Sequence, residues 1–455
     1  MGFTAINPAN GNVVQRYPEM DAETADEIVG RVAAAAETWA GTTFEERAAP
    51  LREAARILRE RAREYGELMT LEMGKPVSGG IAEAEKCAWG CEYFADHAES
   101  FLAPHQVETD AALSYWTYRP LGVVLAIMPW NFPFWQLFRF GAPALMAGNG
   151  ILLKHSSNVP GCALAIEELM REARFPEHLL RTVLVGDSET GDLIDDPRVN
   201  AVTLTGSVRA GRAVAARAGV ALKKTVLELG GSDPYVVLAD ADVEAAAEVC
   251  VRARLVNSGQ SCIAAKRLIA VPEVYDAFRD AVLSRMKKVE MGDPTREDTL
   301  LGPLAREDLR DALHQQVRRS VDAGATCLLG GEVPDRSGWW YPATLLEDVA
   351  PGMPAWDEEL FGPVGVLIRA DSEDDALRIA NDSSFGLGAA VFTSDPARGE
   401  LIARERLEAG ACFVNDFVHS DPRLPFGGIR ESGYGRELSP LGIREFVNAK
   451  TVWVA

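Results

Sequence analysis

The sequence of 455 residues has no hydrophobic run long enough to cross a membrane. Its longest apolar stretch, residues 121–130, is far shorter than the roughly 18 residues that a transmembrane helix needs. The first residues lack the basic and apolar pattern of a secretion signal, and Ile6 stands where a myristoylation signal needs Ser or Thr. These absences predict a cytoplasmic protein without a membrane anchor.

Cysteine and histidine are scarce, with 7 and 6 residues. An odd number of cysteines at irregular spacing does not form a disulfide framework, so we expect reduced thiols. Cys87 and Cys91 lie four residues apart, but no second Cys or His pair at zinc-like spacing accompanies them. We therefore expect no metal site.

Positive charge is in deficit, because 46 Lys and Arg stand against 67 Asp and Glu, which gives a net charge of -21. Such a chain repels nucleic-acid phosphates and anionic membrane surfaces, so we expect neither as a partner. A small anionic substrate is compatible with this charge, because salt screens distant charges beyond about 10 Å and a local Arg can outweigh them.

Short β-branched or apolar segments alternate with helix-like segments along most of the chain, after a helix-rich part at residues 21–74. This alternation predicts an α/β fold with parallel sheets and right-handed crossovers. The first set of expected strands lies at residues 122–127, 151–153, 182–185, 201–205 and 225–229. The second set lies at residues 235–238, 267–271, 364–368, 389–392 and 411–414. Two α/β domains with a cleft between them account for this pattern.

Aromatic and polar side chains alternate over residues 111–120, as in an exposed ribbon or an edge strand. Exposed strands often pair with a second subunit. The apolar C-terminus, residues 451–454, offers a further contact surface. We therefore expect both segments to take part in oligomer formation.

A glycine-containing turn at residues 257–262 ends in Cys262. Placed near a helix start, the thiol would face backbone N–H groups that favour the thiolate, which is the nucleophilic form. The alternative interpretation is a buried structural cysteine.

Two other polar residues follow expected strands. Glu228 ends an apolar segment at the edge where α/β sheets bind ligands, and it can act as a general base on water; the alternative is a surface carboxylate. Asn131 lies among aromatic residues and prolines at 129–133, which would orient its amide as an oxyanion donor; the alternative is an ordinary aromatic loop.

Residues 205–211 form an expected junction between a strand and a helix. Gly206 would allow a pyrophosphate to approach the helix N-terminus, whose free N–H groups and dipole attract anions. The pattern is not G-x-G-x-x-G and is weak evidence alone.

Together these segments resemble the aldehyde dehydrogenase superfamily over nearly the whole chain. The matching segments occur in the family's order, at residues 129–133, 154, 205–207, 228–231, 259–262, 358–363 and 425–428. The resemblance implies a Rossmann-like NAD(P)-binding domain (1–107 and 121–229), an α/β catalytic domain (230–430) and a small β oligomerisation arm (108–120 and 431–455). It also implies a homodimer or homotetramer.

The resemblance assigns a role to each catalytic candidate. It makes Cys262 the nucleophile that forms a thiohemiacetal and then a thioester, and Asn131 with the Cys262 backbone N–H the oxyanion hole. Glu228 becomes the base for the deacylating water, which favours release of a free acid over transfer to coenzyme A. Lys154 and Glu359 would hold the two riboses of the dinucleotide between them. The other implied contacts are Pro129, Trp130, Gly206, Ser207 and Phe361 at the cofactor and Phe426 in the substrate tunnel.

One departure from the family concerns the cofactor. Where many NAD-preferring members have Lys-Pro-Ser-Glu, this chain has Lys154, His155, Ser156 and Ser157. A Glu in the last position would repel a 2′-phosphate, whereas Ser157 and Lys154 can donate hydrogen bonds to it. We therefore expect NADP to be accepted and preferred, with NAD also usable.

Arg139 lies on the helix that is expected to follow the Asn131 loop. Facing the tunnel, it would bind the distal carboxylate of a substrate through a bidentate pair; the alternative is a solvated Arg on a helix surface. Segments 208–211, 232–234, 420–423 and 435–439 also resemble the shorter bacterial succinate-semialdehyde dehydrogenases, which implies that Ser420 assists Arg139. The favoured reaction is therefore oxidation of succinate semialdehyde to succinate.

Three alternatives stay open. The substrate can be another small aliphatic or aromatic aldehyde. A Cys-dependent thiol hydrolase would need a His beside Cys262, and none of the six His lies in a recognisable dyad motif. A non-catalytic binding protein on the same fold is disfavoured, because Cys262, Glu228 and Asn131 are all present.

Overall fold

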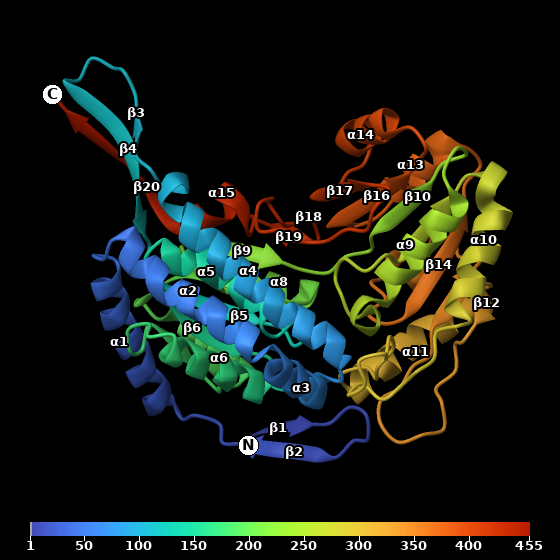
Figure 1. Ribbon diagram of the computed structural model, residues 1–455, viewed down its shortest axis with the longest axis horizontal. Coiled ribbons are helices and arrows are strands. Elements are labelled where there is room, and N and C mark those ends of the chain that lie inside the picture. The colour runs from blue at the N-terminus through green and yellow to red at the C-terminus, as the bar shows by residue number, and fades with distance from the viewer. Residues whose placement is uncertain (1) are drawn as a thin grey trace.

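Two α/β units make up most of the molecule in the computed structural model, which describes residues 2–455 (Figure 1). The first unit contains a six-stranded sheet with the order β19-β9-β8-β5-β6-β7. Its strands are β5 (Val123–Met128), β6 (Gly150–His155), β7 (Leu180–Thr182), β8 (Val199–Thr205), β9 (Lys224–Glu228) and β19 (Gly433–Tyr434). Strands β5 to β9 run parallel, and the strand order reverses between β5 and β8. Open α/β sheets bind ligands at the carboxyl ends of strands beside such a reversal.

Helices cover this sheet, as the period of the sequence predicts. They are α1 (Ala22–Trp39), α2 (Phe44–Glu60), α3 (Ala62–Met73), α4 (Val77–Phe101), α5 (Trp135–Met146), α6 (Pro160–Glu172), α7 (Asp187–Asp195) and α8 (Val208–Val220). A short break separates α1 from α2, and Thr43 is the N-cap of α2 and forms a capping box with Glu46. Helix α4 packs against α2, α3 and α5, and its buried face belongs to the main hydrophobic core.

The second unit is built on a seven-stranded sheet with the order β12-β13-β14-β11-β10-β16-β17. Its strands are β10 (Pro234–Val237), β11 (Arg267–Ala270), β12 (Thr326–Leu329), β13 (Thr344–Glu347), β14 (Val364–Arg369), β16 (Gly388–Phe392) and β17 (Ala411–Val414). Its helices are α9 (Val243–Leu255), α10 (Pro272–Met286), α11 (Glu307–Asp322), α12 (Pro354–Asp357), α13 (Glu373–Asn381) and α14 (Pro396–Glu405). The predicted α/β fold is thus confirmed, and β12 and β13 are two strands that the pattern did not indicate.

A third, three-stranded sheet projects from the body of the molecule (Figure 1). It consists of β3 (His105–Gln106), β4 (Leu113–Pro120) and β20 (Val447–Val454). Of the two alternatives for residues 111–120, an exposed ribbon or an edge strand, the edge strand is wrong, because β4 lies in the middle and pairs with both neighbours. The sheet also differs from the expected arm in extent. It begins at His105, whereas β19 and α15 (Ser439–Ile443) lie against the first unit.

An N-terminal hairpin, which the sequence pattern did not indicate, connects the two units. It consists of β1 (Phe3–Ile6) and β2 (Val13–Tyr17). β1 packs against α3 and α6 of the first unit. The carbonyls of Pro8 and Ala9 accept hydrogen bonds from Trp339 N (2.9 Å) and Trp340 Nε1 (3.1 Å) of the second unit.

A short strand pair, β15 (Phe385–Gly386) and β18 (Ile429–Arg430), completes the sheets. Across residues 2–455, every helix is too short or too polar to span a lipid bilayer.

Candidate active site

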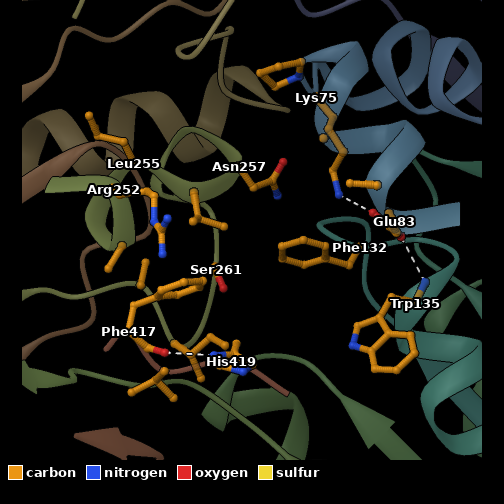
Figure 2. Close-up of a pocket in the computed structure, with 18 of the residues that line it drawn as sticks. Lys75, Glu83, Phe132, Trp135, Arg252, Leu255, Asn257, Ser261, Phe417 and His419 are labelled. Carbon is orange, nitrogen blue, oxygen red and sulfur yellow. Dashed lines mark hydrogen bonds and ion pairs between the residues drawn. The ribbon is translucent and has the colours of Figure 1, made fainter. Parts of the chain in front are cut away.

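A cavity of about 700 Å³ lies between one wall formed by α4 and α5 and a second wall formed by α9, the Cys262 turn and residues 417–420. Figure 2 shows Lys75, Glu83, Phe132 and Trp135 on one side and Arg252, Leu255, Phe417 and His419 on the other. Four residues that the sequence singled out line this cavity: Arg139, Cys262, Ser420 and Phe426. The fold therefore brings distant parts of the chain to one site.

The turn before Cys262 has an unusual backbone. Asn257, Ser258 and Gly259 have φ angles of 52°, 56° and 75°, a left-handed run that is costly for the two residues with side chains. A Cβ on Gly259 would lie 2.2 Å from a backbone oxygen of the segment before β14, so only glycine fits. Asn257 Nδ2 donates to Asn131 O at 2.8 Å and so ties the turn to the loop after β5.

Cys262 is partly exposed to the cavity and follows η1 (Val256–Gly259) in a turn. The expectation that it lies near a helix start is therefore wrong. Burial raises the pKa of the thiol to about 12, and the positive charge of Arg139 opposes this rise. The positive charge of Arg139, and not a helix end, is the feature that favours the thiolate here.

Asn131 is held beside this turn by its own amide. Its Nδ2 donates to Gln260 O at 3.2 Å, while Oδ1 has no hydrogen-bond partner within residues 2–455. A side-chain amide carries two N–H bonds, so one of them stays free for a ligand oxygen. The predicted role of Asn131 as an oxyanion donor is compatible with this arrangement.

Glu228 ends β9 and is buried, and neither of its carboxylate oxygens has a partner in the described chain. Burial raises the pKa of this carboxyl well above its usual range; Arg139 opposes the rise, and Glu437 adds to it. Gly427 makes room for the side chain, since a Cβ there would lie 2.6 Å from Glu228 Oε1. Burial therefore favours the protonated form, and the carboxyl acts as a base only after it loses its proton.

Arg139 is buried in α5 and forms an ion pair through Nε with Glu437. Its guanidinium carbon lies 4.5 Å from the ring centroid of Phe426, and Nη2 has no partner within residues 2–455. The alternative of a solvated surface Arg is therefore wrong. The ion pair was not foreseen, because its partners are 298 residues apart and no spacing rule connects them.

Ser420 accepts hydrogen bonds from two residues that the sequence did not assign to a site. Lys86 Nζ donates to Ser420 Oγ at 2.9 Å, and Trp135 Nε1 donates to the same oxygen at 3.0 Å. Trp135 and Arg139 lie one turn apart on α5 and so share a face. Lys86 carried no signal, because a lone lysine on an amphipathic helix usually marks its solvated side.

Helix α5 begins on a buried carboxylate. Glu83 Oε1 accepts hydrogen bonds from Phe134 N and Trp135 N, both at 2.9 Å, and Glu83 also pairs with the buried Lys75 (Figure 2). An acidic side chain at this point satisfies N–H groups that the helix leaves free and complements the helix dipole. Glu83 thus fixes α5, which carries Arg139, to α4.

The residues predicted to bind a cofactor gather at the carboxyl ends of neighbouring strands. Pro129 and Trp130 follow β5, Lys154 and Ser157 lie at the end of β6, and Gly206 and Ser207 follow β8. Ser207 is the N-cap of α8 and accepts a hydrogen bond from Ala210 N at 3.2 Å. Ser157 is exposed, and Lys154 Nζ lies 3.5 Å from Asp187.

The second unit closes this region from the opposite side. The ring of Phe361 lies 5.6 Å from that of Trp130, at 88° to it. Glu359 accepts a hydrogen bond from Gly231 N at 3.0 Å, and burial raises the pKa of its carboxyl to about 7. Both predicted contacts therefore lie where the two units meet.

These residues fit a dinucleotide. A Cβ on Gly206 would meet no atom closer than 3.7 Å, so the approach to α8 is open. The first turn of α8 contains no acidic residue that would repel a phosphate. Lys154 and Ser157 add hydrogen-bond donors at the end of β6, at the same edge of the sheet.

The sequence model of the aldehyde dehydrogenase family matches residues 1–452 of this chain. A protein of Synechocystis sp., named as a probable NADP(+) succinate-semialdehyde dehydrogenase, is 49% identical over 458 residues, which cover 100% of both chains. The NADP(+) succinate-semialdehyde dehydrogenase of Mycobacterium leprae is 46% identical over 458 residues, with the same coverage. The crystal structure of succinic semialdehyde dehydrogenase from Streptococcus pyogenes in complex with NADP+ has a TM-score of 0.97, 36% identity and 99% coverage of each chain.

Proposed function

Because the chain belongs to the aldehyde dehydrogenase family, we propose that it oxidises succinate semialdehyde to succinate with NADP+ as the preferred acceptor. One observation carries this proposal: the cavity that contains Cys262 also contains Arg139 and Ser420. A nucleophile and a carboxylate-binding pair in one cavity suit a substrate with an aldehyde at one end and a carboxylate at the other. The relatives named for this substrate support the same assignment.

The first half of the reaction forms the acyl enzyme. The Cys262 thiolate attacks the aldehyde carbon, and the oxyanion of the thiohemiacetal receives hydrogen bonds from Asn131 Nδ2 and the Cys262 backbone N–H. Arg139 stabilises the thiolate through its positive charge. The oxidation of the thiohemiacetal to the thioester uses the electron-accepting chemistry that NADP+ supplies when bound.

The second half releases the acid. Glu228, once deprotonated, takes a proton from a water molecule, and the resulting hydroxide attacks the thioester carbon. The burial of Glu228 makes its conjugate acid weak, so the carboxylate is a stronger base than an exposed one. Succinate leaves, and the thiolate of Cys262 is restored.

The cofactor preference is supported by Ser157 and Lys154. The hydroxyl and the ammonium group lie at the carboxyl end of β6, at the same edge of the sheet as the end of β8, and both can donate to a 2′-phosphate. Trp130, Phe361 and Glu359 would hold the nicotinamide half between the two units.

The testing experiment is a panel of aldehydes assayed with both dinucleotides. We expect kcat/KM for succinate semialdehyde with NADP+ to exceed that for butanal by at least about tenfold. A higher value for an uncharged aliphatic or aromatic aldehyde would replace the substrate assignment. Formation of NADPH separates this chemistry from a thiol hydrolase. His419 lines the same cavity as Cys262, and its Nδ1 lies 3.0 Å from Phe417 O.

We also propose a cytoplasmic homodimer or homotetramer. The seven cysteines lie in the described chain as free thiols, which suits a reducing compartment. Strand β20 carries the exposed side chains of Trp453 and Val454 along the projecting sheet, a surface suited to another subunit.

A further inference from the structure

Helix α4 presents a cation to the cavity for which the fold provides no counter-ion. Glu83 and Lys86 lie one turn apart and both line the cavity. No carboxylate in the described range lies within 4.0 Å of Lys86 Nζ. The two carboxylates whose charge acts on Lys86 already have partners of their own. Glu83 pairs with Lys75, and Asp421 pairs with Arg423.

The hydrogen bonds at Ser420 set the direction of its hydroxyl. A serine hydroxyl has two acceptor lone pairs and one O–H donor. Lys86 and Trp135 both donate to Oγ, and neither an ammonium group nor an indole N–H can accept in return. The Ser420 hydrogen has no acceptor within residues 2–455, so it is available to an acceptor in the cavity.

We propose that Lys86 is a specificity-determining residue that binds the distal carboxylate of the substrate together with Ser420 and Arg139. This assignment rests on the proposed function, because it takes the substrate to carry a carboxylate at the end distal to the aldehyde. Lys86 acts in two ways: its remaining N–H bonds reach the carboxylate directly, and its bond to Ser420 turns the hydroxyl into a donor. The ring of Trp135, 4.7 Å from Nζ, holds the ammonium group in place.

An anion is the ligand that this cluster lacks. Lys86 and Arg139 bring two positive charges to one cavity, and Glu437 compensates only Arg139. Burial and the repulsion from Arg139 lower the pKa of Lys86 to about 8; Cys87, Asp421 and Glu83 oppose the decrease. A carboxylate between the two cations would remove this repulsion, whereas an uncharged substrate would leave it.

The first test compares substrates. We expect Lys86→Met to lower the ratio of kcat/KM for succinate semialdehyde to that for butanal by roughly 10- to 100-fold, the effect of one charged hydrogen bond. Lys86→Arg should retain most of the ratio, since it keeps the charge. Lys287→Met, which removes an exposed lysine at the end of α10, is the matched control for net charge and should leave the ratio unchanged. An unchanged ratio in Lys86→Met, or an equal fall in Lys287→Met, would overturn the inference.

The second test does not depend on the substrate that is oxidised. Butyrate should inhibit butanal oxidation competitively, while butyramide should not, and Lys86→Met should raise the inhibition constant of butyrate at least about tenfold. If the wild type prefers an uncharged aldehyde but Lys86→Met still loses butyrate binding, the proposed function fails and the anion site stands. If butyrate inhibits Lys86→Met as well as the wild type, the assignment of Lys86 fails.

Discussion

Glu437 pairs with Nε of Arg139 and leaves Nη2 of the same guanidinium without a partner. The ion pair compensates the buried charge, while the free nitrogen can still bind a ligand. The two groups therefore have separable roles in stability and in recognition, which a set of variants can distinguish.

Arg139→Met should lower the ratio of kcat/KM for succinate semialdehyde to that for butanal by roughly 100-fold, because the substrate carboxylate loses a charged donor. It should also lower the free energy of unfolding by about 3 to 5 kcal/mol, since Glu437 is left buried and unpaired. Arg139→Met with Glu437→Gln should regain much of this stability without regaining the ratio. Denaturant titration and steady-state kinetics measure the two effects, and an equal loss on both aldehydes in the double variant would contradict a role in recognition.

Glu228→Gln should separate the two halves of the reaction. Thioester formation would continue, whereas hydrolysis would slow by roughly 100- to 10,000-fold, because the water loses its base. Rapid mixing should then show a burst of NADPH close to one equivalent per active site, followed by slow turnover. Mass spectrometry should find the acyl group on the peptide that contains Cys262. Cys262→Ala is the control and should show no burst; linear NADPH formation at the wild-type rate in Glu228→Gln would exclude it as the base.

Turnover should increase with pH. Burial raises the pKa of Cys262 to about 12 and that of Glu228 well above its usual range, and both groups act in their deprotonated forms. The active fraction therefore grows as the pH rises, and kcat should increase between about pH 6 and about pH 9. A profile of kcat against pH measures this, and a decrease over this range would show that another ionisation controls the rate.

Ser157→Glu should shift the cofactor preference. A carboxylate at the end of β6 would repel a 2′-phosphate and accept a hydrogen bond from a 2′-hydroxyl. We expect the ratio of kcat/KM with NADP+ to that with NAD+ to fall by roughly 10- to 100-fold. Ser157→Ala, which removes the donor but adds no charge, should cause a smaller decrease. If neither variant changes the ratio, the phosphate is recognised elsewhere, and Lys154 is the next residue to test.

Stability should fall in mild acid because of His155. Its Nε2 lies 2.9 Å from Pro133 O, and its Nδ1 accepts a hydrogen bond from Ser156 N at 2.9 Å, so the buried ring is neutral. Burial lowers the pKa to about 4, below the 6.5 of a free imidazole. The unfolded chain therefore binds more protons between these values, and stability decreases as the pH falls through this window. The contribution amounts to about 2 kcal/mol between about pH 7 and about pH 5.

Denaturant titrations of wild type and His155→Gln at the two pH values provide the measurement. The variant should be less sensitive to pH, because glutamine does not titrate. An identical pH dependence in both proteins would show that other groups account for it.

The α/β fold could be predicted because it follows from local pattern. β5 and β10 are continuous apolar runs, and Thr43 begins α2 through its capping box. Cys262 and Glu228 could be singled out as candidates because one lies in a turn and the other at a strand end of distinctive composition. The contacts between side chains from distant segments could not be predicted, because they depend on how those segments pack together. The pairing of Lys86 with Ser420 joins residues 334 apart, and only the packed fold brings them together.

Two predictions were wrong for a related reason: that Cys262 lies near a helix start, and that residues 111–120 form an edge strand. A glycine-rich segment before a cysteine suits either a helix start or a left-handed turn, and the choice depends on the contacts of Asn257 and Gly259. Alternation of side chains in a strand shows two unequal faces, but it does not show whether one or both edges are paired.

The N-terminal hairpin has a consequence for motion. Its carbonyls at Pro8 and Ala9 hold the loop of Trp339 and Trp340, while β1 rests on the helices of the other unit. Any opening of the cleft between the two units must first lengthen these hydrogen bonds. The hairpin lies outside the reaction centre. It nevertheless limits how far the two units can separate when a dinucleotide binds or is released.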